Sequence, residues 1–124
     1  MKANELRIGN IVIQGEIVRI QESSARVKYE LDGQDRLSYV DYDILEPIPL
    51  TEEWLIKFDL MLDTKSDEIV RYSMIRFPDF TVILQNNEQG QVEFNGYHIC
   101  YVNFVHQFQN LYFALTGKEL TIKE

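Results

Sequence analysis

Two histidines and one cysteine are the side chains of this sequence best suited to covalent or acid–base chemistry: His98, Cys100 and His106. A cysteine acts as a nucleophile when a base lies beside it and its pKa is depressed. His98 lies two residues before Cys100, so the two side chains would share one face of a regular strand. The surrounding segment 97–102 is apolar and typical of a buried strand, which favours a structural role for Cys100.

His106 falls in a predicted helix over residues 103–116, where it could serve as a general base or a metal ligand. A metal site needs three or four converging ligands, and no histidine or cysteine lies one helical turn from His106. We therefore expect His106 to hydrogen-bond a neighbouring loop, and we predict no metal and no cofactor. Its polar neighbours are amides rather than acids: Asn103, Gln107, Gln109 and Asn110.

Other catalytic patterns are absent from the sequence. It has no glycine-rich phosphate loop, no GxGxxG and no GxSxG motif. Its single cysteine leaves no paired-cysteine zinc spacing and no internal disulfide. The sequence therefore predicts a protein that is not an enzyme. A small hydrolase or transferase using His106 or Cys100 ranks last among the alternatives.

The charge of the chain is strongly acidic: 12 basic and 20 acidic residues give a formal charge of −8 over 124 residues. Nucleic-acid binding depends largely on neutralising phosphates with Lys and Arg, so nucleic acid is a disfavoured partner. The apolar runs are far shorter than the ~20 residues of a membrane-spanning helix, and residues 1–7 lack the apolar stretch of a signal peptide. We expect a cytoplasmic protein that does not enter a membrane.

The first fifty residues read as short strands. Between residues 25 and 32, apolar and charged residues alternate, which is typical of a half-buried strand. Asp32-Gly33 suits a hairpin turn because both residues tolerate positive φ. Further strands are predicted over 11–13, 17–20 and around 37–39, with a helical turn at 41–45. We predict a small SH3-like barrel over residues 1–50, a shape that selects no function by itself.

Pro47 and Pro49 mark the predicted boundary, because proline disfavours helix in the residue before it. Thr51 can cap a helix whose apolar stripe contains Trp54, Phe58 and Met61. A polar loop at 63–68, strands over 72–77, 80–84, 92–94 and 97–99, and turns at 78–79, 86–90 and 95–96 lead to the last helix. The sequence thus predicts an α+β protein with a second, α-β-β-β-β-α part at 51–124. Whether the two parts share one core is left open.

The last helix has an unusually wide apolar surface. Its main stripe contains Phe104, Phe108, Leu111 and Leu115, with Val105 and Tyr112 beside it, whereas Phe113 lies well round the helix. If Tyr112 is buried then Phe113 is partly exposed, or the reverse. A helix that is apolar on more than one side often meets a second surface. Self-association or partner binding through this helix is one hypothesis, and a wide core contact is the other.

Three stretches together carry a family resemblance: residues 6–12, 47–55 and 105–120. In order and spacing they resemble a group of small uncharacterised proteins from Bacteroidetes genomes, often found near prophage or other mobile DNA. The resemblance implies no activity, and suggests an accessory or mobile-element setting. It directs attention to His106, Gln109 and Asn110 in the third stretch. This chain departs from the family at Phe108, where leucine is common, and at Asp59, where a glycine often follows the aromatic residue.

The leading hypothesis is a non-enzymatic module that binds a protein partner or itself. Its candidate interaction or structural positions are His106, Gln109, Asn110, Tyr112 and Phe113. A second hypothesis is nucleic-acid binding through one exposed side of the small barrel. That side would carry Arg19, Arg26, Lys28 and Arg36. A third is that the acidic chain mimics DNA, which would need ordered rows of surface carboxylates.

Overall fold

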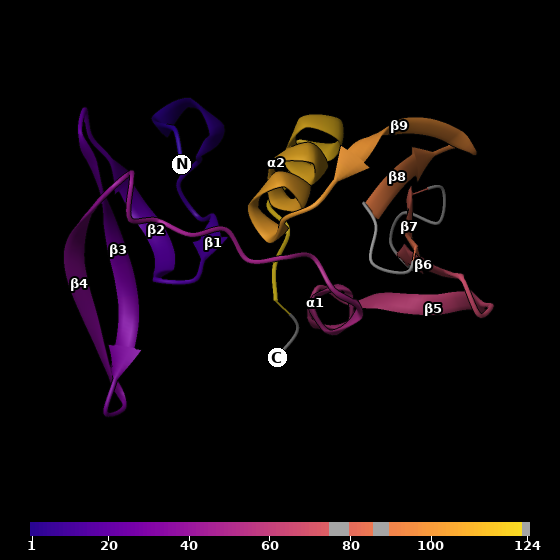
Figure 1. Cartoon of the computed structure of the whole chain (residues 1–124), viewed down its shortest axis with the longest axis horizontal. Coiled ribbons are helices and arrows are strands. Elements are labelled where there is room, and N and C mark those ends of the chain that lie inside the picture. The colour runs from indigo at the N-terminus through magenta and orange to yellow at the C-terminus, as the bar shows by residue number, and fades with distance from the viewer. Residues whose placement is uncertain (75–79, 86–89, 123–124) are drawn as a thin grey trace. The chain divides into compact units, whose positions relative to one another are not determined.

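A computed structural model describes residues 1–74, 80–85 and 90–122 of the chain. It contains two antiparallel sheets and two α-helices (Figure 1), so the predicted α+β class is confirmed. The contacts divide the chain into two compact units. The N-unit comprises Met1–Pro49 and Phe104–Lys118, and the C-unit comprises Leu50–Asn103 and Glu119–Glu124. The predicted division into 1–50 and 51–124 concerned domains and stays a prediction.

The sheet of the N-unit has four strands in the order β1-β2-β3-β4. A short 3-10 helix, η1 (Ala3–Glu5), precedes the strands, and α2 (Val105–Thr116) completes the unit. The sheet is open, with β1 and β4 as its edges, and among the described residues it does not close into a barrel. The SH3-like part of the fold prediction is therefore not confirmed. The strands are β1 (Ile11–Val12), β2 (Gly15–Ile20), β3 (Ser24–Leu31) and β4 (Gln34–Asp41).

The core of the N-unit lies on one face of β3. Ala25 and Val27 are fully buried there, as their alternation with charged residues predicts. The alternation fails at the far end of the strand, where Leu31 is 47% exposed, because β3 and β4 continue as a hairpin past the residues that cover the core. The residues packed with Ala25 and Val27 are Leu6, Val12, Ile17, Tyr42 and Leu45.

A β-bulge at Val18 changes which residues of β2 face outward. Ile17 pairs with Val27, but the next pair is Arg19 with Arg26, so Val18 is the extra residue. A bulge inserts one residue into one strand of a pair. Ile17 and Arg19 would share a face in a regular strand, yet here Ile17 enters the core and Arg19 lies on the opposite, exposed face.

The C-unit is built on a five-stranded meander in the order β5-β6-β7-β8-β9, with the helix α1 (Glu52–Lys57) before it. The sequence predicted four strands here. The fifth arises because α1 ends early: Asp59 adopts a left-handed conformation (φ 68°), and β5 starts at the next residue. Met61, predicted as part of the helical core stripe, is instead a strand residue with 54% of its surface exposed. The strands are β5 (Leu60–Lys65), β6 (Ile69–Met74), β7 (Phe80–Gln85), β8 (Gly90–Phe94) and β9 (Tyr97–Val102).

One face of the five-stranded sheet holds the apolar core of the C-unit, to which Leu55 of α1 and Phe58, the residue after α1, also contribute. The predicted Asn95-Gly96 hairpin is confirmed: both residues have positive φ and join β8 to β9. The predicted turn at 78–79, most of that at 86–90 and the end of the strand over 72–77 lie outside the described residues. The hydrophobic sheet residues buried on this face are Leu60, Tyr72, Met74, Phe80, Val82, Val92 and Val102, and Ile83 is buried on the other face.

No helix in the described part of the chain combines the length and the apolar character needed to cross a membrane.

Candidate functional site

Gln109 of α2 is buried at 3% exposure and uses both ends of its side-chain amide. Its Oε1 accepts a hydrogen bond of 2.8 Å from the Ile11 backbone N–H, and its Nε2 donates one of 3.1 Å to the Gly9 carbonyl. Buried backbone groups that lack a sheet or helix partner need such a substitute. Gln109 therefore supplies the main-chain partners that β1 lacks at its start.

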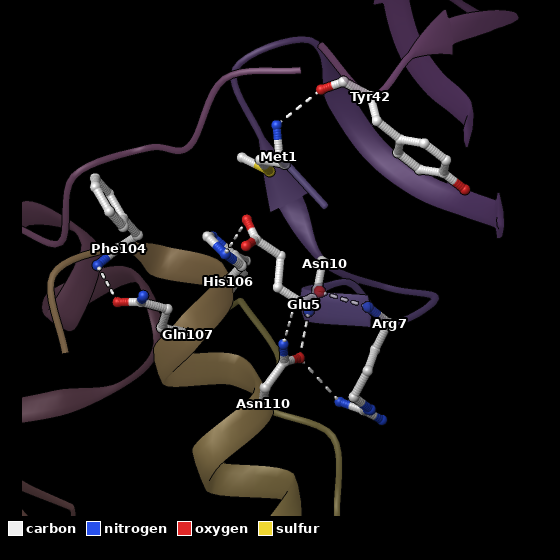
Figure 2. Close-up of polar contacts among 9 residues, drawn as sticks. All are labelled: Met1, Glu5, Arg7, Asn10, Tyr42, Phe104, His106, Gln107 and Asn110. Carbon is white, nitrogen blue, oxygen red and sulfur yellow. Dashed lines mark hydrogen bonds and ion pairs between the residues drawn. The ribbon is translucent and has the colours of Figure 1, made fainter. Parts of the chain in front are cut away.

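Asn10 and Asn110 form the centre of a polar cluster between α2 and the amino-terminal segment (Figure 2). Asn10, only 1% exposed, donates from Nδ2 to Asn110 Oδ1 over 2.8 Å and accepts from the Arg7 backbone N–H over 2.7 Å. Asn110 in turn donates to the Glu5 carbonyl over 3.0 Å. The sequence pointed to Asn110 but missed Asn10, whose partner is one hundred residues away.

His106 is the least accessible member of this cluster after Asn10, at 2% exposure. Its Nε2 lies 3.7 Å from a Glu5 carboxylate oxygen, which is too long for a hydrogen bond. Its ring stacks on that of Phe104, with centroids 6.0 Å apart, and its buried Nδ1 has no hydrogen-bond partner among the described groups. Burial holds the pKa of His106 below its ordinary value, against an opposing effect of Glu5 and with a smaller lowering by the amino terminus.

The lowered pKa keeps His106 neutral at pH 7, so its contact with Glu5 is not a full ion pair. A general base must be within reach of a substrate proton, and a ring with 2% exposure is not. His106, Gln109 and Asn110 thus lie together along the buried side of α2, where Gln109 and Asn110 hydrogen-bond residues 5–11 and His106 faces Glu5.

The sequence allows either Tyr112 or Phe113 to be buried with the other partly exposed, and the structure has Tyr112 buried. Tyr112 is buried at 4% exposure, and Phe113 is 37% exposed. The Arg7 guanidinium carbon lies 3.8 Å from the centroid of the Phe113 ring, within the range of a cation–π contact. Because Arg7 covers this ring, α2 offers less apolar surface to a partner than its sequence suggests.

His98 and Cys100 do not share a face, because β9 is not a regular strand. His98 pairs with Glu93 and Cys100 with Val92, which makes Ile99 the extra residue of a bulge. Cys100 consequently lies on the face of buried Val92, and the His98 ring packs at a tilt against that of Tyr101 with ring centroids 4.8 Å apart. Burial raises the pKa of the Cys100 thiol, which keeps it protonated at neutral pH. This arrangement does not activate a nucleophile.

Within the described ranges, no group of three or more His, Cys, Asp or Glu side chains could hold a metal ion.

Among the described residues of the C-unit, the edge strand β9 has the most exposed aromatic side chains. Tyr97 is 75% exposed and Tyr101 56%, and the neighbouring Ile99 is 41% exposed. Of the strands that the structure describes, β9 is the last in its sheet and pairs only with β8, so its outer edge has no partner strand there. The sequence predicts that residues 97–102 are buried, whereas only Val102 is fully so. The adjacent Asn95-Gly96 hairpin, together with the helix that follows, was the signal that could have identified residues 97–102 as the last strand of a meander.

The basic residues proposed to form one exposed side lie on two faces of the N-unit sheet. Arg19 pairs with Arg26, and Lys28 lies two residues further along β3, so these three share the outer face. Arg36 pairs with Tyr29, which alternates with Lys28 and so faces the other way. The predicted four-residue basic surface is reduced to three residues.

Comparison with known proteins returned no match to any family model, to any curated protein or to any solved structure.

Proposed function

We propose that this protein is a non-catalytic interaction module that binds an extended segment of another protein along the free edge of β9. The single observation that carries the proposal is the exposed, uncharged edge of Tyr97–Val102. In strand addition, main-chain hydrogen bonds supply affinity and alternate side chains supply specificity. β9 offers both, since its outer backbone edge is unpaired and its aromatic side chains are accessible.

The other sheet edges carry the protection that β9 lacks. Natural edge strands avoid unwanted pairing by being short, by carrying charged side chains or by bulging. β1 has two residues, β4 contains Asp35, Arg36 and Asp41, and β5 contains Asp63, Lys65 and a bulge. β9 contains a bulge at Ile99 but no Asp, Glu, Lys or Arg. An edge left without charge on a chain of formal charge −8 is consistent with selection for pairing.

The expected partner is an extended segment with apolar or aromatic residues on both of its faces and basic residues at its ends. The apolar residues follow from the exposed Tyr97, Ile99 and Tyr101, and the need for both faces follows from the bulge at Ile99, which turns Tyr97 and Tyr101 to opposite faces of β9. The basic ends follow from charge, because the C-unit has five basic and eleven acidic residues, a formal charge of −6. Electrostatic attraction of this kind mainly raises the rate of association.

A non-catalytic role is further supported by the state of the two nucleophile or base candidates. His106 is enclosed by α2 and residues of the amino-terminal segment, and Cys100 is a protonated thiol on the buried face of β9. Glu5 lies 3.7 Å from His106, but the His106 ring is 2% exposed and out of reach of a substrate.

A display library of twelve-residue peptides, selected on the intact protein, tests the proposal. We expect apolar peptides with basic ends to be enriched, and their binding to protect the amides of 97–102 from hydrogen exchange. Tyr101→Lys should raise the dissociation constant at least ~10-fold, because a charge on the edge disfavours strand pairing. Leu62→Lys is the matched control, since Leu62 lies on the opposite edge strand with 52% exposure.

Selected peptides whose affinity is unchanged by Tyr101→Lys, or is lowered equally by Leu62→Lys, would contradict the proposed site. Enrichment of no extended peptide would contradict the proposed function.

Two further proposals concern the fold of the N-unit sheet and the genetic setting of the protein. We propose that the N-unit sheet is an open relative of the small SH3-like barrel, on the support of four consecutive antiparallel strands, a bulge in β2 and a turn after β4. We also propose an accessory, mobile-element setting, on the support of the resemblance of residues 6–12, 47–55 and 105–120 to small Bacteroidetes proteins.

A further inference from the structure

The outer face of the N-unit sheet, the side away from its core, is arranged in three rows that run across the strands. The basic row is Arg19, Arg26 and Tyr39, the middle row is Glu16, Lys28 and Leu37, and the acidic row is Glu30 and Asp35. Leu37 is 49% exposed and Tyr39 56% exposed, so the face is open to contact. We call these eight residues the outer face; the pair Ser24–Asp41 lies beyond the basic row on the same side of the sheet.

Like charges stand directly opposite each other in two of these rows. Arg19 pairs with Arg26, and Glu30 pairs with Asp35. Such cross-strand pairs are destabilising when nothing offsets them. The basic pair exists only because the bulge at Val18 brings Arg19 opposite Arg26; a regular continuation from the Ile17–Val27 pair would place Val18 there. A costly pair that depends on a strand irregularity indicates a requirement beyond folding.

The basic row has little internal compensation. The Arg26 guanidinium carbon lies 5.3 Å from the Tyr39 ring centroid, and the buried Nε of Arg26 has no hydrogen-bond partner among the described atoms. In the middle row, by contrast, Lys28 lies 3.9 Å from Glu16. The outer face therefore has a basic row, a neutral centre with an exposed leucine, and an acidic row.

We propose that the outer face binds the same face of a second copy of this chain in an antiparallel, two-fold arrangement. A two-fold axis along the middle row, perpendicular to the strands, places the basic row of each copy over the acidic row of the other. Arg26 then faces Glu30 of the second copy, and Leu37 meets Leu37 at the axis. Contacts of this isologous kind are the commonest way in which identical chains associate.

A second copy fits the outer face better than a nucleic acid does. A phosphate backbone would gain from Arg19, Arg26 and Lys28 but would be repelled by the acidic row on the same face and by the net charge of −8. A second copy uses both charged rows and also covers Leu37. Charge complementarity therefore favours the copy.

The contact is small, which sets the expected strength. Side chains of one row are about 4.8 Å apart across strands, and rows are about 6.7 Å apart along them. Three rows on three strands cover a few hundred Å², well under the ~800 Å² that each partner contributes to a standard interface. We expect a weak dimer that salt dissociates, because surface charge pairs are screened at high ionic strength.

A charge-exchange experiment on the full chain, followed by sedimentation equilibrium up to 1 mM in 50 mM NaCl, tests the proposal. The variant Arg19→Glu/Arg26→Glu makes both ends of the face acidic, and Glu30→Lys/Asp35→Lys makes both basic. Each variant alone should be monomeric where the unchanged protein dimerises, and a 1:1 mixture should recover the dimer. The formal charges are −12 and −4, since each reversal changes the charge by two, so overall attraction cannot produce that recovery.

Arg36→Glu is the matched control, because it makes the same kind of charge reversal on the other face of β4 and should leave the dimer intact. Far-ultraviolet circular dichroism of every variant checks that the fold is retained. A protein that is monomeric at 1 mM, a mixture that does not associate, or equal loss in the Arg36 control would each overturn the proposal. So would a monomer that binds a 20-nucleotide single strand through Arg26, since that would make the face a nucleic-acid site. Tyr101→Lys should not alter dimerisation, which separates this surface from the β9 edge.

Discussion

The helix α2 and the strand β9 are neighbours in sequence but use their polar groups in opposite ways. In α2, the side chains of Gln109 and Asn110 are hydrogen-bonded to residues 5–11, and Gln109 is buried. In β9, an edge of the main chain is unpaired and the aromatic side chains are exposed. His106, Gln109 and Asn110, which look functional in the sequence, form an anchor that holds α2 to the amino-terminal segment. The apolar strand β9, by contrast, has the exposed surface.

A side-chain amide on a helix can replace a missing strand partner. Gln109 gives the Ile11 N–H and the Gly9 C=O the hydrogen bonds that another strand beside β1 would supply. The net gain from each such bond is modest, but losing the partner of a buried group costs ~1–3 kcal/mol. Substitutions in the anchor should therefore affect stability, and substitutions in β9 should affect binding.

The largest effect is expected for Gln109→Ala. It removes the side-chain partner of the Ile11 N–H and of the Gly9 carbonyl, so we expect the free energy of unfolding to fall by ~2–4 kcal/mol. Urea denaturation at pH 7 measures it. Gln107→Ala is the control on the same helix, because Gln107 is exposed and accepts the Phe104 backbone N–H over 3.3 Å; it should cost no more than ~1 kcal/mol. Equal losses for the two variants would show that the anchor contributes nothing special.

A smaller, pH-dependent effect is expected at His106. Its pKa in the folded protein lies below the ordinary value of 6.5, so the unfolded chain binds a proton more readily. The contribution of His106 to stability is complete above pH 6.5 and is lost as pH falls through 6.5 toward the folded pKa. His106→Gln should flatten this part of the stability-versus-pH curve.

Glu5→Gln provides the matched test of the same site. Glu5 raises the His106 pKa, so removing its charge should lower that pKa further and steepen the loss of stability at low pH. An unchanged slope in both variants would show that His106 does not titrate differently in the folded and unfolded chains.

The smallest effect is expected for the edge variant Tyr101→Lys. Its side chain is 56% exposed, and substitutions at exposed sites without special contacts usually change stability by less than ~0.5 kcal/mol. Urea denaturation beside Gln109→Ala would test the contrast directly. A loss above ~1 kcal/mol would mean that Tyr101, which packs against the His98 ring, is part of the C-unit's structure and not a free contact surface.

The sequence carried the fold class and several elements because the relevant signals are local. The alternation at Ala25 and Val27, the Asn95-Gly96 turn and the helix ended by Gly117 each depend on neighbouring residues. Only part of the anchor could be predicted from the sequence. His106, Gln109 and Asn110 stood out among apolar helix residues, but Asn10 gives no sign of a partner at position 110.

Two of the errors share a physical cause, which is a one-residue irregularity. Asp59 ends α1 in a left-handed conformation and sends Met61 to the surface of a strand. The bulge at Ile99 separates His98 from Cys100. A bulge reverses the face of every residue beyond it, and neither irregularity has a local pattern strong enough to predict it.

The pairing at the two ends of the C-unit bears on the order in which the chain can fold. The Leu50 N–H donates to the Asn103 carbonyl over 2.9 Å, so the segment between them begins and ends at one point. Before this segment folds, bringing Asn10 to Asn110 closes a loop of one hundred residues. Loop-closure entropy grows with the logarithm of loop length, so once the middle of the chain has folded, this closure has far less freedom to lose. On a ribosome the middle is also complete before α2 is made, so the order of synthesis likewise favours folding of the middle before this closure.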